Sequence, residues 1–302
     1  MGVRFPPGAI GESVADFFGI VPLQDPEFNY LKDLIYERTG IFLAPHKKIM
    51  LQSRLNIRLR VNQISNFQEY VKKLKTDKAF FSSEILEIIN RVTTNKTDFF
   101  RENHHFEYLS KTFLPAFEER KKILPHKTLR IWSSACSTGE EPYSIAITVS
   151  EYFFGKPGWD IKIYASDIDT NVLAIAEKGV YKEDRVNTLN PEIVRKHFLL
   201  KTNPDGSKEY SVKPNLKSMI TFKKINLLDS TYPFVEKLDV IFCRNVIIYF
   251  DKPTQKKLFA NIEKYLDDNG LLVIGHSETL FGISDAFKFI GHTIYQKKIA
   301  TK

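Results

Sequence analysis

The stretch IWSSACSTGEEPYS, residues 131–144, places two adjacent carboxylates where an apolar strand runs into a helix. Gly139 allows a close approach of the backbone, and Pro142 suits the first turn of that helix. Loops that cradle phosphate groups are instead rich in glycine and basic residues. Glu140 and Glu141 therefore predict a ligand that presents a cation or hydroxyl groups to the protein.

Polar side chains also follow the later strand-like runs of the chain. A carboxylate after the second strand of an α/β sheet commonly binds two ribose hydroxyls, and an amide beside an apolar side chain suits a purine ring. Together these loops predict a nucleoside pocket without a phosphate clamp. S-adenosylmethionine carries a nucleoside, an ammonium and a sulfonium, so it fits the glutamates. The side chains are Asp167, Asn226, Leu227, Arg244, Asn245 and His276.

Each of these residues also has a purely structural interpretation. Asp167 alone suits a helix N-cap, and Cys136 beside a strand end is typical of a core residue. His276 suits a packed loop. The pair His104–His105 has no metal-ligand spacing with an acid or a cysteine, so we expect it on a surface helix face. No metal site is expected.

The elements that must position these side chains fall into two regimes. Residues 25–91 contain apolar positions at helical spacing and no alternating strand pattern, which predicts a small helical domain. After residues 121–127, strand-like and helical runs alternate, which predicts a doubly wound α/β sheet. The last strand has no room for a crossover helix before it, so we expect it to pair antiparallel. A turn signal within 198–222 predicts a small β insertion.

Bulk properties exclude some classes of protein. The 302 residues contain no apolar run long enough to span a membrane, and the N-terminus lacks the pattern of a secretory signal. The two cysteines, Cys136 and Cys243, end apolar runs, so we expect them to be buried and reduced, as in a cytoplasmic protein. The formal net charge of +8 leaves nucleic acid or an acidic protein surface as partners.

Five strings together resemble the CheR-type chemoreceptor glutamate methyltransferases. The resemblance covers about residues 26–298 and implies a helical N-terminal domain, a linker and a class I S-adenosylmethionine-dependent methyltransferase sheet with a small β subdomain. The implied boundaries are 1–25 (extension), 26–92 (helical domain), 93–127 (linker and active-site segment) and 128–302 (methyltransferase domain with an insertion at about 198–222). The strings are TTNKTDFFRENHHF, WSSACSTGEEPYSIAI, YASDIDTNVLAIAEKGVY, FCRNVIIYFD and GHSE.

The resemblance also implies roles for individual residues. The cofactor is S-adenosyl-L-methionine, the product is S-adenosyl-L-homocysteine, and Arg101 and Tyr249 lie at the reacting centre. A glutamate acceptor is already an anion at neutral pH, so the reaction needs orientation and desolvation rather than a general base. The expected cofactor contacts are Asn95, Thr97, Arg101, Glu141, Asp167, Asn226, Leu227, Arg244 and Asn245.

A basic helix is the expected partner surface. Lys47, Arg54 and Arg58 fall on one stripe at 100° per residue, and in the resembled family a basic helix here contacts the acidic methylation region of the receptor. The insertion has only Gly206 where tether-binding relatives carry a glycine-rich loop, so docking on a receptor tether is not expected. We expect a cytoplasmic monomer that neither binds nucleic acid nor inserts into a membrane.

Two other functions are considered for this sequence. A methyltransferase acting on nucleic acid would match the positive charge, but no NPPY- or DPPY-like motif follows the fourth strand, where FCRNVIIYF stands. A non-catalytic module that binds S-adenosylmethionine for signalling would not need the reacting-centre residues Arg101 and Tyr249, which are both present.

Overall fold

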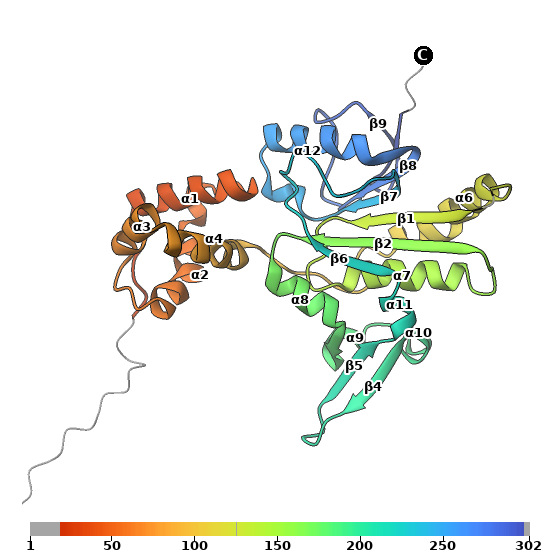
Figure 1. Ribbon diagram of the computed structural model, residues 1–302, viewed down its shortest axis with the longest axis horizontal. Helices are drawn as coiled ribbons and strands as arrows, with labels where there is room; N and C mark the ends of the chain where they lie inside the picture. The colour runs from red at the N-terminus through yellow and green to blue at the C-terminus, as the bar shows by residue number, and fades with distance from the viewer. Residues whose placement is uncertain (1–18, 125, 299–302) are drawn as a thin grey trace, which may run out of the picture. The chain divides into compact units, whose positions relative to one another are not determined.

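The computed structural model describes residues 19–124 and 126–298, which form two compact units (Figure 1). The first contains the described residues up to Ile35 together with Leu43–Val92. The second contains Tyr36–Phe42 together with the described residues from Thr93 onward. The last turn of the first helix thus packs with the second unit, although its sequence continues the helical pattern of the first.

The first unit is helical, as its sequence predicts. Leu51, Leu55 and Leu59 recur every four residues, and each is at most 1% exposed. They bury one face of α2 (Lys48–Val61) in the core of this unit. Asn66 caps the next helix by accepting a hydrogen bond from the Glu69 backbone N–H at 2.8 Å. The elements are α1 (Asp25–Thr39), η2 (Pro45–Lys47), α2 (Lys48–Val61), α3 (Phe67–Thr76) and α4 (Lys78–Val92).

The prediction that Arg58 belongs to an exposed basic stripe on α2 is wrong. This guanidinium is buried and forms two 2.7 Å hydrogen bonds with the Glu84 carboxylate, which also accepts one from Tyr70. The charge of Arg58 is therefore compensated inside the unit and is not offered to a partner. Arg54 is half-buried and donates to the backbone carbonyl of Val92. Lys47 is exposed.

The second unit contains a seven-stranded sheet in the order β6-β2-β1-β7-β8-β10-β9. The pairs from β6 through β8 are parallel, and β10 pairs antiparallel with both β8 and β9, which confirms the expected antiparallel ending. The strands are β1 (Lys127–Ser133), β2 (Trp159–Asp167), β6 (Ile220–Lys224), β7 (Leu238–Cys243), β8 (Leu266–Ile274), β9 (Phe287–Gly291) and β10 (Ile294–Lys297).

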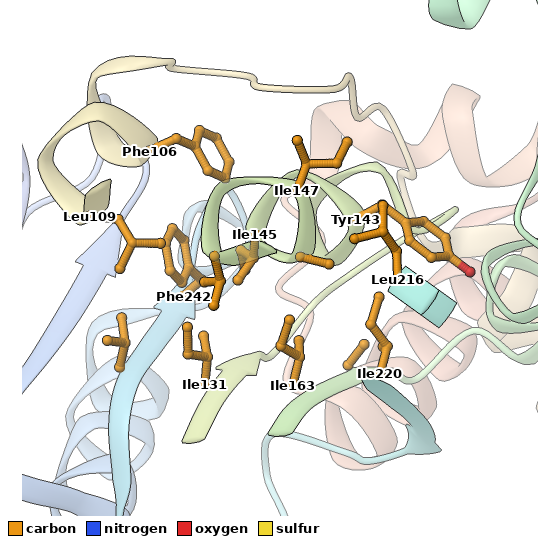
Figure 2. Packing of buried hydrophobic residues seen from close by; sticks show 14 of the residues in the cluster. Phe106, Leu109, Ile131, Tyr143, Ile145, Ile147, Ile163, Leu216, Ile220 and Phe242 are labelled. Carbon is orange, nitrogen blue, oxygen red and sulfur yellow. The ribbon is translucent and has the colours of Figure 1, made fainter. Parts of the chain in front are cut away.

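Helices cover both faces of this sheet, so its central strands are apolar on both sides. On β1, Ile131 packs in one hydrophobic cluster while its neighbour Trp132 packs in the other. Figure 2 shows Ile131, Ile163 and Phe242 beneath α7 (Glu140–Tyr152). Every residue of β7 is buried, as expected for a central parallel strand.

The remaining helices include a π-helical turn, η3. The α5–α6 segment precedes the sheet, and the others connect its strands. They are α5 (His104–Tyr108), η3 (Leu109–Phe113), α6 (Leu114–Lys121), α8 (Thr170–Lys178), α9 (Glu183–Val186), α10 (Pro191–His197), α11 (Pro214–Lys217), η4 (Ile247–Tyr249) and α12 (Lys252–Tyr265).

The small insertion is a separate three-stranded sheet in the order β3-β5-β4. Its strands are β3 (Val180–Lys182), β4 (Phe198–Thr202) and β5 (Lys208–Val212), paired antiparallel. The sheet therefore begins earlier than residue 198, and β6, which overlaps the end of the predicted range, belongs to the large sheet. Both cysteines are free and buried, as expected. Among the described residues, no helix is long and apolar enough to cross a membrane.

Candidate functional site

The two glutamates that follow β1 are buried, and each is paired with an arginine. Glu140 bonds to the Arg185 guanidinium and accepts a 2.6 Å hydrogen bond from Thr138. Glu141 accepts from the Ser133 hydroxyl at 2.7 Å and from Arg244 at 2.9 Å. The glutamates are thus already neutralised by arginines of the protein, a compensation that the sequence argument did not anticipate.

Glu141 nevertheless remains a costly anion. Its burial raises the pKa of the carboxyl above the ordinary value, although the Arg244 charge and the bonds from Ser133 and Arg244 oppose the rise. A ligand cation next to this carboxylate would further stabilise the ionised form. The chemistry of the donor set therefore fits an ammonium or a sulfonium.

Asp167 ends β2 beside the same loop. Its carboxylate accepts backbone N–H hydrogen bonds from Ser137 at 2.9 Å and from Asp169 at 3.0 Å. Burial raises the pKa of Asp167 to about 6, although these N–H groups work against the rise. A buried carboxylate that is incompletely compensated suits the two hydroxyls of a ribose, because each can donate a hydrogen bond.

The segment 93–101 runs across these strand ends. Asn95 donates to the Asp169 carboxylate at 2.7 Å, and its carbonyl accepts from the Ser137 hydroxyl at 2.9 Å. Thr97 is buried, and its carbonyl accepts from Arg185. These contacts place Asn95 next to the loops after β1 and β2, and they place Thr97 on the guanidinium that also binds Glu140.

Arg101 lies near the end of this segment and is half-buried. Its guanidinium donates to the Lys96 carbonyl at 3.0 Å, and its own carbonyl accepts from Arg244. Arg244 thus joins the end of β7 both to the Arg101 backbone and to Glu141.

The loops after β7 and β8 are held together by a buried carboxylate. Glu278 accepts hydrogen bonds from the backbone N–H groups of Asn245, Ile247 and Gly275 at 2.6–3.0 Å. Tyr249 is half-buried on η4, and its carbonyl accepts from the Phe42 N–H at 2.8 Å. Tyr249 is therefore carried by a loop whose backbone is fixed from two sides.

Asn226 and Leu227 lie at the end of β6. The Asn226 amide donates to the Arg38 carbonyl at 2.7 Å, and its oxygen accepts from the Leu228 N–H at 3.0 Å. Leu227 is buried and lines a pocket of about 420 Å³, whose walls also include Gly40 and residues of α12. The Asn226 side chain thus shapes this loop through the backbone.

The structure brings the expected residues of the second unit to one edge of the sheet, at the carboxyl ends of β1, β2, β6, β7 and β8. Three further residues contact these loops but were not predicted from the sequence to have a role. Glu278 belongs to the quoted GHSE string and Glu102 to TTNKTDFFRENHHF, but neither was given a role. Arg185 lies on α9 and had no motif signal. Among the described residues, no group of three or more His, Cys, Asp or Glu is placed to hold a metal.

The expectation for the histidines also needs correction. His105 is buried rather than on a surface face, and its Nε2 contacts the His292 carbonyl at 2.8 Å. Burial lowers the pKa of His105 to about 4, so the ring is neutral at neutral pH. His276 is not packed: its side chain is 68% exposed, and its Nδ1 contacts the Glu102 carboxylate at 2.8 Å.

The sheet order, the antiparallel ending and the carboxylates at the strand ends define a class I S-adenosylmethionine-dependent methyltransferase. Two family models match the chain: "CheR methyltransferase, SAM binding domain" over residues 95–296, and "CheR methyltransferase, all-alpha domain" over residues 26–93. The chain belongs to the CheR methyltransferase family. The predicted family, cofactor and enzyme class are thereby confirmed.

Relatives that are similar along nearly their whole length support this assignment. The "Chemotaxis protein methyltransferase" of Borreliella burgdorferi is 39% identical over 272 residues, which cover 90% of this chain and 94% of the relative. "Chemotaxis protein methyltransferase 2" of Pseudomonas aeruginosa is 41% identical over 271 residues, covering 89% and 92%. The Escherichia coli protein is 39% identical over 274 residues, covering 90% and 91%.

The Asp167 carboxylate leads to a prediction about cofactor affinity. Lowering the pH from 8 to 5 should weaken S-adenosylhomocysteine binding about tenfold, because protonation near pH 6 removes the charged acceptor of the ribose hydroxyls. Asp167→Asn should weaken binding at least tenfold at pH 8, about 1.4 kcal/mol, and abolish this pH dependence. Calorimetric titration at both pH values tests this, and an unchanged slope in the variant would contradict it.

Proposed function

We propose that this protein transfers methyl groups from S-adenosylmethionine to glutamate side chains in the cytoplasmic methylation region of chemoreceptors. It acts as a cytoplasmic monomer that binds neither nucleic acid nor the lipid bilayer. The observation that carries the proposal is the convergence of Asp167, Glu141 and Arg101 at one sheet edge in a chain of the CheR methyltransferase family.

The cofactor would be held at this edge by a few groups of the protein. Asp167 would accept from the ribose hydroxyls, and Glu141 would face the cationic part of the ligand. Asn95 and Thr97 lie on the segment beside both, while Asn226 and Leu227 shape the wall for the adenine. When bound, S-adenosylmethionine supplies an electrophilic methyl group attached to a positively charged sulfur.

The residues of the protein must orient the acceptor rather than activate it. A glutamate side chain is already ionised at neutral pH, so its oxygen is a nucleophile without loss of a proton. The Arg101 guanidinium has the planar fork that matches a carboxylate, and it donates a hydrogen bond to the Lys96 carbonyl. Arg101 therefore binds and turns the acceptor, while Tyr249 borders the reacting centre from η4.

The receptor surface proposed here is the exposed part of the segment 45–62. Lys47 remains available at the start of α2, and Arg54 contributes at its edge, but Arg58 does not. Arg60 is exposed near the end of α2, three residues after Ile57, which is 39% exposed, and Ile49 near the start of the helix is 77% exposed. Exposed cations next to apolar side chains suit an acidic amphipathic helix, such as a receptor methylation helix.

Replacing Lys47 and Arg60 together by alanine should raise the KM for a receptor fragment about fivefold, roughly 1 kcal/mol, with kcat within about twofold of wild type. Both cations are exposed, and their loss should remove attraction to an acidic partner without touching the methyl-transfer site. The salt dependence of the rate should also become shallower. Steady-state kinetics at low and high salt measure both effects.

The matched control is Lys72→Ala with Lys78→Ala, which removes two exposed cations from the same unit outside the segment 45–62. This control should behave as wild type. If the two double variants raise KM equally, the effect comes from net charge alone and the proposed receptor surface is wrong.

The experiment that separates this function from nucleic-acid methylation offers the enzyme both acceptors. Receptor cytoplasmic fragments and total nucleic acid from the same cells are incubated with labelled S-adenosylmethionine, and peptide mass spectrometry locates the methyl group. Methyl esters on receptor glutamates support the proposal. Label in nucleic acid with none in receptor would overturn it.

A further inference from the structure

The Arg101 segment is strained on both sides. Phe100 and Glu102 have φ values of 52° and 57°, in the left-handed region that L-residues with bulky side chains rarely adopt. Each such residue costs about 1–2 kcal/mol and persists only where its surroundings hold it. Something in the second unit must therefore fix this turn.

On the Phe100 side the restraint is simple. The Phe100 N–H donates to the Ser144 hydroxyl of α7 at 2.9 Å, and that hydroxyl in turn donates to the Glu140 carbonyl at 2.7 Å. This contact fixes the backbone before Arg101 but leaves the residue after it unconstrained.

On the other side the restraint is the Glu102 carboxylate, whose side chain is only 9% exposed. One oxygen accepts from the Asn245 amide at 3.2 Å and contacts His276 Nδ1 at 2.8 Å. The other accepts from the His276 N–H at 3.1 Å and lies 3.1 Å from Arg244 Nη2. Glu102 thus ties its own turn to the loops after β7 and β8.

These contacts leave the carboxylate little capacity for chemistry of its own. It takes part in three hydrogen bonds, and it also lies 3.1 Å from the Arg244 guanidinium and 3.5 Å from His105 Nδ1. Burial alone would raise the pKa of Glu102, but the His276 hydrogen bond and the Arg244 charge outweigh it and lower the pKa to about 2. Such a group is a poor base, so it serves as an anchor.

The groups that Glu102 holds are those of the proposed site. Arg244 Nη2 also donates to the carbonyl of Arg101, so the same guanidinium group touches the residues on both sides of the Arg101–Glu102 peptide bond. Asn245 is also left-handed, with φ 56°, a conformation that asparagine adopts more readily than most residues.

We propose that Glu102 is a positioning residue for methyl transfer, which holds the Arg101 side chain at the acceptor by tying residues 100–102 to the ends of β7 and β8. The role rests on the proposed function, since it acts through Arg101 on the acceptor carboxylate. Loss of the anchor should free a strained turn, and a misplaced orienting group lowers the rate of the chemical step rather than affinity for the cofactor.

The test compares Glu102→Gln and Glu102→Ala with wild type. The amide keeps the shape but loses the charge pair with Arg244, so kcat should fall about tenfold for Gln and about 100-fold for Ala. S-adenosylhomocysteine affinity and receptor KM should change less than about threefold. Hydrogen–deuterium exchange of residues 99–103 should be faster in both variants. The control is Glu107→Gln, an exposed carboxylate paired with Lys111, which should match wild type.

The outcomes distinguish this role from the proposed function. Wild-type enzyme that methylates no receptor fragment overturns the proposed function, and the exchange measurement then still decides whether Glu102 holds the turn. An active Glu102→Ala variant with wild-type kcat and unchanged exchange overturns the positioning role. A parallel loss of cofactor affinity and kcat would also overturn it, because a general loss of structure would explain that pattern.

Discussion

Arg101→Ala should lower kcat about 100-fold even at saturating receptor fragment, while S-adenosylhomocysteine binds within a few-fold of its wild-type affinity. The reason is the task of the guanidinium, which turns an acceptor that is already nucleophilic. Arg101 is placed for this by the strained turn on which it lies and by the Arg244 bond to its carbonyl. Single-turnover methyl transfer and calorimetric titration measure the two quantities separately.

The matched control for Arg101 is Arg195→Ala, which removes a guanidinium from the 83% exposed Arg195 side chain on α10 of the same unit. This variant should keep the wild-type kcat. An Arg101→Ala enzyme that raises KM but retains kcat would show that Arg101 contributes only uniform binding, and the orienting role would be withdrawn.

Arg244→Met should destabilise the second unit by about 3–5 kcal/mol at pH 8, because it leaves the buried carboxylates of Glu141 and Glu102 without their shared cation. In the variant the pKa of the Glu102 carboxyl should rise above its unfolded value, and the pKa of Glu141, which burial already raises in the wild type, should rise further. The penalty is then relieved as the pH falls toward 5, where the carboxyls can protonate, and it returns as the pH rises. Urea unfolding of variant and wild type at both pH values measures the difference.

Comparison with wild type at each pH cancels groups that titrate in both proteins, such as Asp167 with its pKa raised to about 6. Arg244→Lys keeps one positive charge but not the planar fork of the guanidinium. Its free energy of unfolding should therefore lie between those of the wild type and of Arg244→Met. Destabilisation below about 1 kcal/mol, or the same at both pH values, would show that the two carboxylates do not depend on Arg244.

Most of the fold follows from local patterns. The period of the apolar residues separates the helical first unit from the α/β second unit, and the short connection before β10 requires an antiparallel strand. The position of Asp167 follows as well, because any residue that ends β2 must reach the same edge as the ends of β1 and β7.

Charge pairing could not be predicted in this way. Arg58 and Glu84 are 26 positions apart, and only the packing of α2 against α4 shows that their charges cancel inside the first unit. Glu141 and Arg244 are 103 positions apart, and Glu140 and Arg185, which also pair, are 45 positions apart. A basic stripe or an acidic loop in a sequence shows where charges lie along the chain, but its partner is a property of the folded structure.

The most direct measurement of the central claim is the alkali lability of the transferred methyl group. Receptor cytoplasmic fragment is methylated with tritiated S-adenosylmethionine by wild type and by Arg101→Ala, then treated with base. We expect volatile tritiated methanol from the wild-type reaction, because base hydrolyses a glutamate methyl ester, and a strongly reduced yield from the variant at equal cofactor affinity. Label that remains on the protein after base treatment would contradict it.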